Sequence, residues 1–374
     1  MRAGRLLVGA GLAAALLLGS AVPAFGQTAP DSAAEFSKQA SQLYQLFGKA
    51  AAGGGAYAVS LRQDGRSFAR AYGTLDCGGL TPLSSDALFD GGSLTKLFTT
   101  AAVLKLVEAG RLKLDDRLGT LFADVPPDKR AITVAQLLAH RSGIPNFVGL
   151  DGRVLADSAW TIESYDYGPL SRAQLLGNVW RAPLEFPPGT QDAYSNTGFT
   201  ILAAVIETAS GELYESFVRR AVFAPAGMRN TGYLLMDKAG LPVTQQCRDG
   251  RPWGDPLSRE VWKNGVSWNL IGAGGMMTTL GDLQRFTAAI EQGPLFRADI
   301  RERFQQMTYG ASARCRTSAA ALGGSNGMTR SLILHLPRRN QALIAVATSR
   351  EHGLPAEADM LAIICPGPET RPAR

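Results

Sequence analysis

The stretch FDGGSLTKLFTTAAVLKLVE, residues 89–108, combines a helix start with two reactive side chains. Ser93 follows two glycines and opens an apolar run that predicts a helix ending at Gly110. Lys96 stands three residues after Ser93, so a helix would project both side chains from the same face. Two interpretations stay open. The pair is either a serine nucleophile with a lysine base, or a helix-capping serine beside a solvated lysine.

The first 26 residues have the pattern of an export signal. Arg2 and Arg5 precede an apolar run that reaches Leu18, and small residues follow up to Gly26. An uncleaved membrane anchor is the alternative, but the apolar run is short for a span and no basic cluster follows it. We therefore expect a signal peptide over residues 1–26, cleavage, and a secreted or periplasmic protein with no stable membrane anchor.

Charge and composition argue against several kinds of partner. Of 38 basic residues, Arg2 and Arg5 leave with the signal, so 36 face 32 acidic residues and the mature charge is +4. The basic residues are scattered, which argues against nucleic-acid binding. Three widely spaced histidines and four cysteines without a Cys-x-x-Cys pair predict no metal site and no cofactor. Export would favour disulfides, and four cysteines allow three pairings.

Two strand hairpins are predicted, one near each end of the mature chain. The first flanks the turn Gln63-Asp64-Gly65, because Asp-Gly between β-type runs is a hairpin signal. The second joins MTRSLILHLP and QALIAVATSR, residues 328–337 and 341–350, through a Pro-Arg-Arg-Asn turn. Helices are predicted at residues 31–50, 278–293 and 355–365. In the second of these, Thr279 and Asp282 have the spacing of a capping box.

These elements predict an α/β (α+β) fold. An antiparallel sheet built from both chain ends, flanked by helices, would hold an inserted, mainly helical region. The predicted boundaries assign residues 31–110 and 275–367 to the sheet domain and residues 111–274 to the helical domain, where β-type runs are scarce.

Several long stretches resemble one family. Four stretches occur in the order in which the members of that family carry them. They are the run after residue 89, ITVAQLLAHRSGIPNF (132–147), PPGTQDAYSNTGFTILAAVIETASG (187–211) and GAGGMMTTLGDLQRF (272–286). The chain resembles the serine β-lactamase-like family, which joins class C β-lactamases, D-alanyl-D-alanine carboxypeptidases and related esterases. The resemblance implies the β-lactamase-like fold and an acyl-enzyme on Ser93.

The second family motif, Tyr-x-Asn, is Tyr194-Ser195-Asn196 here. The resemblance implies that Tyr194 shares the general-base role with Lys96, with its phenol pKa lowered by nearby cations. Asn196 would hold Lys96 and hydrogen-bond a substrate carbonyl. The alternative is a loop tyrosine that caps the next helix. The parallel also places His140 in a structural turn, where we interpret it as a buried, hydrogen-bonded histidine.

The third family motif is altered. Lys-Thr-Gly or His-x-Gly is usual, but matching the glycines puts Ala321 in place of the cation and leaves Gly323 as the matching glycine. The resemblance implies an oxyanion hole from the backbone N–H groups of Ser93 and Gly324. Without the cation, recognition of an anionic substrate weakens. Three arginines are candidates to replace it: Arg314, Arg316 and Arg330.

The leading hypothesis is an exported serine hydrolase acting on a small-molecule ester, peptide or β-lactam-like substrate. Because Ala321 lacks charge, a neutral ester or an unusual peptide is favoured over efficient β-lactam hydrolysis. The alternative is a catalytically impaired relative that binds a cell-wall fragment or a protein partner.

Overall fold

The fold is described by a computed structural model. It describes residues 32–146, 170–233, 240–248, 251–254, 266–308, 310–312, 317–325, 329–348 and 352–365. The predicted signal peptide, residues 1–26, lies outside these ranges. Within them, no helix combines the length and the apolar character that crossing a membrane requires.

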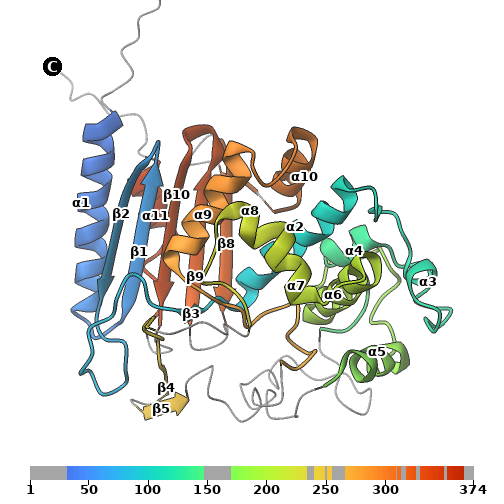
Figure 1. Ribbon diagram of the computed structural model, residues 1–374. Coiled ribbons are helices and arrows are strands. Elements are labelled where there is room, and N and C mark those ends of the chain that lie inside the picture. Colours follow the sequence, from blue (N-terminus) through green and yellow to red (C-terminus); the bar gives the residue numbers. More distant parts are fainter. Residues whose placement is uncertain are drawn as a thin grey trace, which may run out of the picture.

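A six-stranded antiparallel sheet forms one side of the fold, on the left in Figure 1. Its strand order is β2-β1-β10-β9-β8-β7, so strands from the two ends of the chain lie side by side in the middle. This arrangement confirms the predicted sheet. The strands are β1 (Tyr57–Gln63), β2 (Arg66–Tyr72), β7 (Gly310–Ser312), β8 (Thr317–Ser325), β9 (Arg330–Leu336) and β10 (Gln341–Ala347).

Both predicted hairpins are present. Gln63 pairs with Arg66, which leaves Asp64 and Gly65 as a two-residue turn. Both turn residues have positive φ, +47° and +80°, as a type I′ hairpin requires. The second hairpin joins β9 to β10 through a short 3₁₀ turn, Pro337–Arg339.

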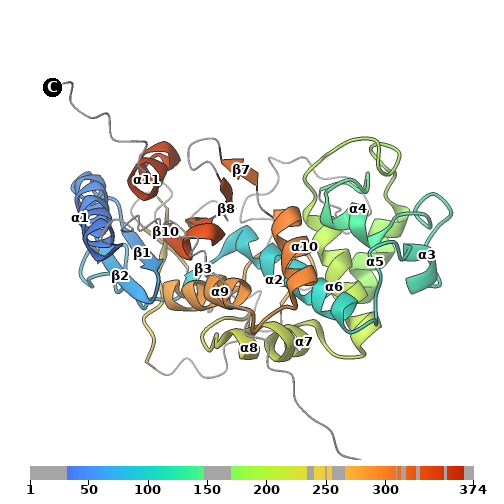
Figure 2. The same ribbon diagram turned by 90° about the horizontal axis from the view of Figure 1, so that it is seen from above.

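Helices cover both faces of the sheet (Figure 2). On one face α1 (Ser32–Ala51) and α11 (Glu357–Ile364) lie over the strands, and on the other lie α9 (Leu280–Gln292) and α2 (Thr95–Glu108). Strand β10 shows the division clearly. Leu343 and Ala345 belong to the core under α1 and α11, whereas Ile344 and Val346 belong to the larger core that includes α2. The strand is therefore apolar on both sides.

Helix α2 is the element on which the site depends. Eleven of its 14 residues are buried, because it lies between the sheet and the helical region and contacts α6. This position explains its apolar run without polar alternation. The remaining helices of the described chain are α3 (Leu118–Leu121), α4 (Val134–Leu138), α5 (Arg172–Arg181), α6 (Asn196–Ser210), α7 (Tyr214–Val218), a π-helical turn (Arg219–Phe223), α8 (Ala224–Ala226) and α10 (Ala298–Thr308).

Two small strand pairs complete the described elements. Strand β3 (Phe89–Asp90), directly before the Ser93 turn, pairs with β6 (Met277–Thr278). Strand β4 (Gln246–Arg248) pairs with β5 (Arg251–Gly254). The β3–β6 pair ties the turn that carries Ser93 to the segment leading into α9.

The predicted capping box before α9 is half formed. Thr279 Oγ1 accepts the Asp282 N–H at 3.1 Å, as expected. The Asp282 carboxylate, however, accepts hydrogen bonds from Asn230 N and Thr231 Oγ1, both at 2.7 Å, and so joins α9 to the segment after α8. Tertiary donors of this kind have no local sequence signal.

The described cysteines are oxidised. Cys77 and Cys365 are both disulfide-bonded. The Cys77 amide donates to Gln245 Oε1 at 3.1 Å, and Cys365 is buried at the end of α11. The side chains of Cys247 and Cys315 lie outside the described part of the chain, so the pairing stays open.

Candidate active site

Ser93 lies in a 3₁₀ turn, Gly92–Leu94, directly before α2. Gly92 has a φ of +52°, which glycine adopts without steric cost. Asp90 Oδ1 accepts the Gly92 N–H at 2.8 Å and fixes the turn. The helix N-terminus has no side-chain cap, so the capping interpretation of Ser93 is wrong. Its hydroxyl instead contacts Lys96 and Tyr194.

Lys96 lies inside the protein, not in solvent. Its side chain is 7% exposed, and burial lowers its pKa to about 7. The Nζ atom lies 3.3 Å from Ser93 Oγ, 2.7 Å from Asn196 Oδ1 and 2.5 Å from the carbonyl oxygen of Ala273. The solvated-lysine interpretation is therefore wrong as well.

The contacts of Lys96 orient its lone pair. Asn196 Oδ1 and the Ala273 carbonyl can only accept hydrogen bonds. A neutral amine has two N–H groups, and these two acceptors take both. The lone pair then faces the third neighbour, Ser93 Oγ, which is the geometry that a general base needs.

Tyr194 reaches the same hydroxyl from the loop before α6. The residue as a whole is 49% exposed, while its OH group points inward and lies 2.7 Å from Ser93 Oγ. The expectation of a lowered pKa is wrong. Burial raises the pKa of Tyr194, and the hydrogen bond with Ser93 offsets this increase only in part. Lys96 Nζ lies over the ring face, 4.9 Å from its centroid.

Asn196 is the first residue of α6. Ser195 caps this helix, because its Oγ accepts the Gly198 N–H at 3.1 Å. The cap directs the Asn196 side chain toward Lys96 and Tyr194. The Asn196 Nδ2 group already donates to Asn146 Oδ1 at 3.0 Å, and its expected bond to a substrate carbonyl stays a prediction.

His140 is hydrogen-bonded, as expected, but only half-buried. Its Nδ1 accepts the Ser195 N–H at 3.2 Å, and burial together with the nearby Lys96 lowers its pKa to about 4. Its ring lies 4.7 Å from the Tyr194 ring and 5.1 Å from that of Phe199. A neutral imidazole thus forms one wall behind Tyr194. No motif in the sequence predicts this contact.

Strand β8 runs past the Ser93 turn. A Cβ atom on Gly324 would lie 2.3 Å from the carbonyl oxygen of Gly91 and 3.0 Å from Leu94 Cγ, so only glycine permits this approach. Across the ladder, Gly323 pairs with Leu332 and Ala321 with Leu334. The backbone of β8 therefore contacts the residues that flank Ser93.

Among the described residues, Lys96 alone brings an ammonium or guanidinium group into contact with Ser93, Tyr194 or Asn196. Arg330 is exposed, and its Nη1 lies beside Gly353, 3.4 Å from where a Cβ on that glycine would be. Arg314 and Arg316 lie outside the described residues. Arg330 therefore makes no described contact that would replace the missing cation.

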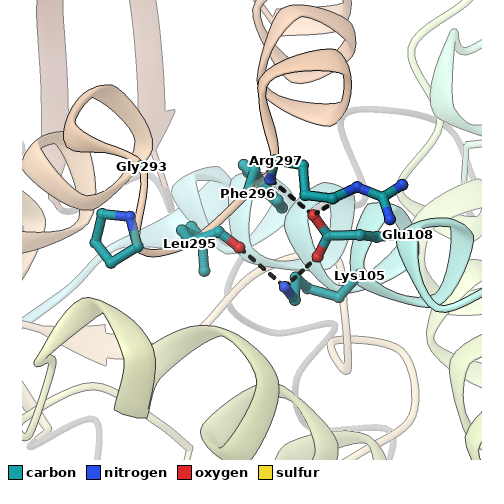
Figure 3. Close-up of a pocket in the computed structure, with 7 residues that line it drawn as sticks. Lys105, Glu108, Gly293, Leu295, Phe296 and Arg297 are labelled. Carbon is teal, nitrogen blue, oxygen red and sulfur yellow. Dashed lines mark hydrogen bonds and ion pairs between the residues drawn. The ribbon is translucent and has the colours of Figure 1, made fainter. Parts of the chain in front are cut away.

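A cavity of about 420 Å³ lies at the opposite end of α2 (Figure 3). Its charged groups satisfy one another: Lys105 donates to Glu108 and to the Leu295 carbonyl, and the Arg297 N–H donates to Glu108 Oε1. This network joins α2 to the segment between α9 and α10. We interpret it as a structural junction, remote from Ser93.

Comparisons with known proteins found several matches. The beta-lactamase family model matches residues 41–362. Penicillin-binding protein 4* of Bacillus subtilis is 32% identical over 40% of this chain and 31% of its own length. D-alanyl-D-alanine-carboxypeptidase/endopeptidase AmpH of Escherichia coli is 28% identical over 64% of this chain and 58% of its own. The matches thus span less than two thirds of these relatives. The solved structure of D-amino acid amidase from Ochrobactrum anthropi shares the fold, with a TM-score of 0.67 at 20% identity over 87% of this chain and 98% of that one.

Proposed function

Because this chain belongs to the beta-lactamase family, we propose that it is an exported serine hydrolase that forms an acyl-enzyme on Ser93. One observation carries the proposal: the buried Lys96 amine lies between two acceptors that turn its lone pair toward Ser93 Oγ. The relatives whose names state an activity are hydrolases, which supports the same reaction class.

Acylation begins with attack of Ser93 Oγ on the carbonyl carbon of an ester or amide. Neutral Lys96 takes the hydroxyl proton as the new C–O bond forms. The bond to the leaving group then breaks, and the Tyr194 hydroxyl, 2.7 Å from Ser93 Oγ, gives its proton to the leaving atom. The proton held on Lys96 reaches the phenol oxygen through a solvent water, because the described contacts include no hydrogen bond between Lys96 Nζ and that oxygen. Tyr194 acts here as a neutral proton relay, since its raised pKa disfavours the tyrosinate.

Hydrolysis of the acyl-enzyme completes the cycle. Water attacks the ester carbonyl while Lys96 again accepts a proton. The bond from the carbonyl carbon to Ser93 Oγ then breaks, Lys96 returns the proton to Ser93 Oγ at 3.3 Å, and the acid leaves. Through both steps the developing oxyanion is held by the N–H of Ser93 and by the backbone of β8 at Gly323 and Gly324. No metal or cofactor takes part in this scheme.

The substrate class follows from the charges at the site. Relatives named as carboxypeptidases act on D-alanyl-D-alanine peptides, whose terminal carboxylate calls for a cation. The described site has only Lys96, which the reaction occupies. We therefore favour an uncharged ester or an unusual peptide over efficient β-lactam hydrolysis.

The alternative, an impaired relative that binds a cell-wall fragment or a protein partner, rests on Ala321 alone. Burying an amine costs free energy, and a binding protein has no need of a buried amine. Lys96 carries that cost and also contacts Ser93, and this combination favours a working enzyme.

Export is part of the proposal. The pattern of residues 1–26 supports it, and so do the disulfides of Cys77 and Cys365, because such bonds persist in oxidising compartments. The mature chain would then begin shortly before α1.

Intact-mass measurement tests the proposal. The purified mature chain is incubated with a penicillin, a p-nitrophenyl ester and a phosphonate, and we expect an adduct of the acyl or phosphonyl mass from at least the ester and the phosphonate. Ser93→Ala should give none, while Ser142→Ala, which removes another buried hydroxyl that accepts the Ile144 N–H, should react as the wild type does. Absence of every adduct would leave the binding protein as the better hypothesis.

The close approach of β8 gives a second expectation. Gly324→Ala places a Cβ against the Gly91 carbonyl, so either β8 or the Ser93 turn must shift. A displaced oxyanion donor should lower the acylation rate constant about 10- to 100-fold. The matched control is Gly198→Ala, whose Cβ would make only ordinary contacts, the nearest at 3.7 Å. Its acylation rate constant should stay within about threefold of the wild-type value, because a substitution without a steric conflict has a small effect. Equal rates for the two variants would remove β8 from the oxyanion hole.

A further inference from the structure

We propose that Asn146 is a positioning residue that sets which way the Asn196 amide faces and so keeps the Lys96 lone pair on Ser93. The inference rests on the proposed function, since it concerns how Lys96 is prepared for proton transfer. The family motifs in the sequence assign Asn146 no part in the chemistry.

The orientation of both amides can be deduced from one backbone group. The Asn196 main-chain N–H is always a donor, and it meets a side-chain atom of Asn146 at 2.8 Å. That atom must therefore be the carbonyl oxygen, Oδ1. The same oxygen lies 3.0 Å from the Asn196 side chain, so the group facing it must be the NH₂.

The other atom of the Asn196 amide is then the oxygen. It is the atom 2.7 Å from Lys96 Nζ, and an amine facing an acceptor must use an N–H there. With the second N–H on Ala273 O, the lone pair is left for Ser93. If the Asn196 amide were reversed, its NH₂ would face Lys96 and would draw the lone pair away from the nucleophile.

Asn146 is itself fixed by α6. Its main-chain carbonyl accepts the Thr197 N–H at 3.2 Å and the Thr197 hydroxyl at 2.7 Å. The preceding Pro145 carbonyl accepts the Ser195 hydroxyl at 3.3 Å. Residues 145 and 146 thus bond to three successive residues, 195 to 197, at the start of α6. This attachment keeps Oδ1 in place beside Asn196.

Two substitutions separate orientation from simple stability. Asn146→Ala removes the oxygen that selects the amide orientation. Asn146→Asp keeps an oxygen in its place but adds a negative charge two hydrogen bonds from Lys96. The groups that face Lys96 from the described elements, Tyr194 on the loop before α6 and His140 after α4, are unchanged in both variants.

The readout is the acylation rate constant for a p-nitrophenyl ester between pH 5.5 and 9.5. For Asn146→Ala we expect the high-pH plateau to fall about 10- to 30-fold. For Asn146→Asp we expect the plateau to stay within about threefold of wild type, while its midpoint moves upward by about one pH unit because the carboxylate favours protonated Lys96. The control Thr197→Val loses a hydrogen bond to the same Asn146 but leaves the amide contact, and should lower thermal stability without moving the midpoint.

The outcomes separate this inference from the proposed function. If the wild type forms no adduct with the ester, both fail. If the wild type reacts and Asn146→Ala keeps the wild-type plateau, only the inference is overturned. The inference also fails if Asn146→Asp leaves the midpoint in place, since Asn146 would then not be coupled to Lys96.

Discussion

Lys96→Met is expected to lower the rate constant for acylation of Ser93 on the order of 10³-fold, within the range that general-base catalysis contributes. Methionine has a similar length and tolerates burial, but it has no lone pair for the Ser93 proton. The loss should be equal for a p-nitrophenyl ester and for an alkyl ester, because deprotonation of the nucleophile precedes departure of either leaving group. Quenched-flow intact-mass kinetics at pH 8.5 measures it, where wild-type Lys96 is neutral.

The pH profile of the wild type checks the same assignment. Protonated lysine cannot accept a proton, so the rate constant should rise about tenfold per pH unit below the pKa of Lys96, which is about 7, and level off above it. A rate constant that instead keeps rising to pH 10 would assign the base role to Tyr194, whose pKa is raised.

Tyr194→Phe supplies the contrasting control. It keeps the ring against His140 and Lys96 and removes only the hydroxyl. If Tyr194 protonates the leaving group, the variant should react slowly with an alkyl ester and almost normally with the p-nitrophenyl ester, since p-nitrophenolate leaves without a proton. An equal loss with both esters would mean that Tyr194 acts on Ser93 and not on the leaving group.

Local signals predicted much of this fold. The Asp64-Gly65 turn, the helix after Ser93 and the short C-terminal helix each depend on nearby residues, so periodicity and turn chemistry were sufficient. That one antiparallel sheet is shared by both chain ends was also predicted, because a hairpin lies near each end of the mature chain. The boundaries of the two predicted domains at residues 110 and 274 stay predictions, since α2 packs on both regions.

The site was only partly predictable, and the reason lies in the groups that complete it. Ser93, Lys96, Tyr194 and Asn196 belong to side-chain motifs with fixed spacing. The Ala273 carbonyl that holds Lys96 is a backbone atom, which any residue supplies. The raised pKa of Tyr194 is caused by burial, which only tertiary structure decides.

The role of Asn146 also depends on tertiary structure. It stands 50 residues before Asn196, and its side-chain oxygen matters only because a helix cap brings the two together. Nothing in its own neighbourhood along the chain marks it as part of a site. The useful signal is structural: one oxygen that accepts both a main-chain N–H and a side-chain NH₂ from the same residue.

The second large effect concerns stability, and it also centres on Lys96. In the unfolded chain a lysine titrates near its usual value of 10.5, whereas in the folded protein burial brings the pKa of Lys96 to about 7. Between these values the unfolded state binds more protons than the folded state, so the free energy of unfolding must rise with pH. Below pH 7 both states are protonated and the full cost of burying the ammonium remains. Above pH 10.5 neither state is protonated and that cost disappears.

This linkage predicts that the stability of the wild type relative to Lys96→Met increases by about 3 kcal/mol between pH 6 and pH 9.5, since each pH unit within the window contributes about 1.4 kcal/mol. Urea unfolding of both proteins at several pH values measures the difference. The change of this difference with pH does not contain the free energy of the hydrogen bonds that Lys96 makes and methionine cannot make, because that contribution does not depend on pH. Lys49→Met, which removes an exposed lysine from α1, should follow the wild-type curve in parallel. If the free energy of unfolding of Lys96→Met also runs parallel to that of the wild type against pH, Lys96 keeps its ordinary charge in the folded protein. A lysine that stays charged could not serve Ser93 as a base near neutral pH.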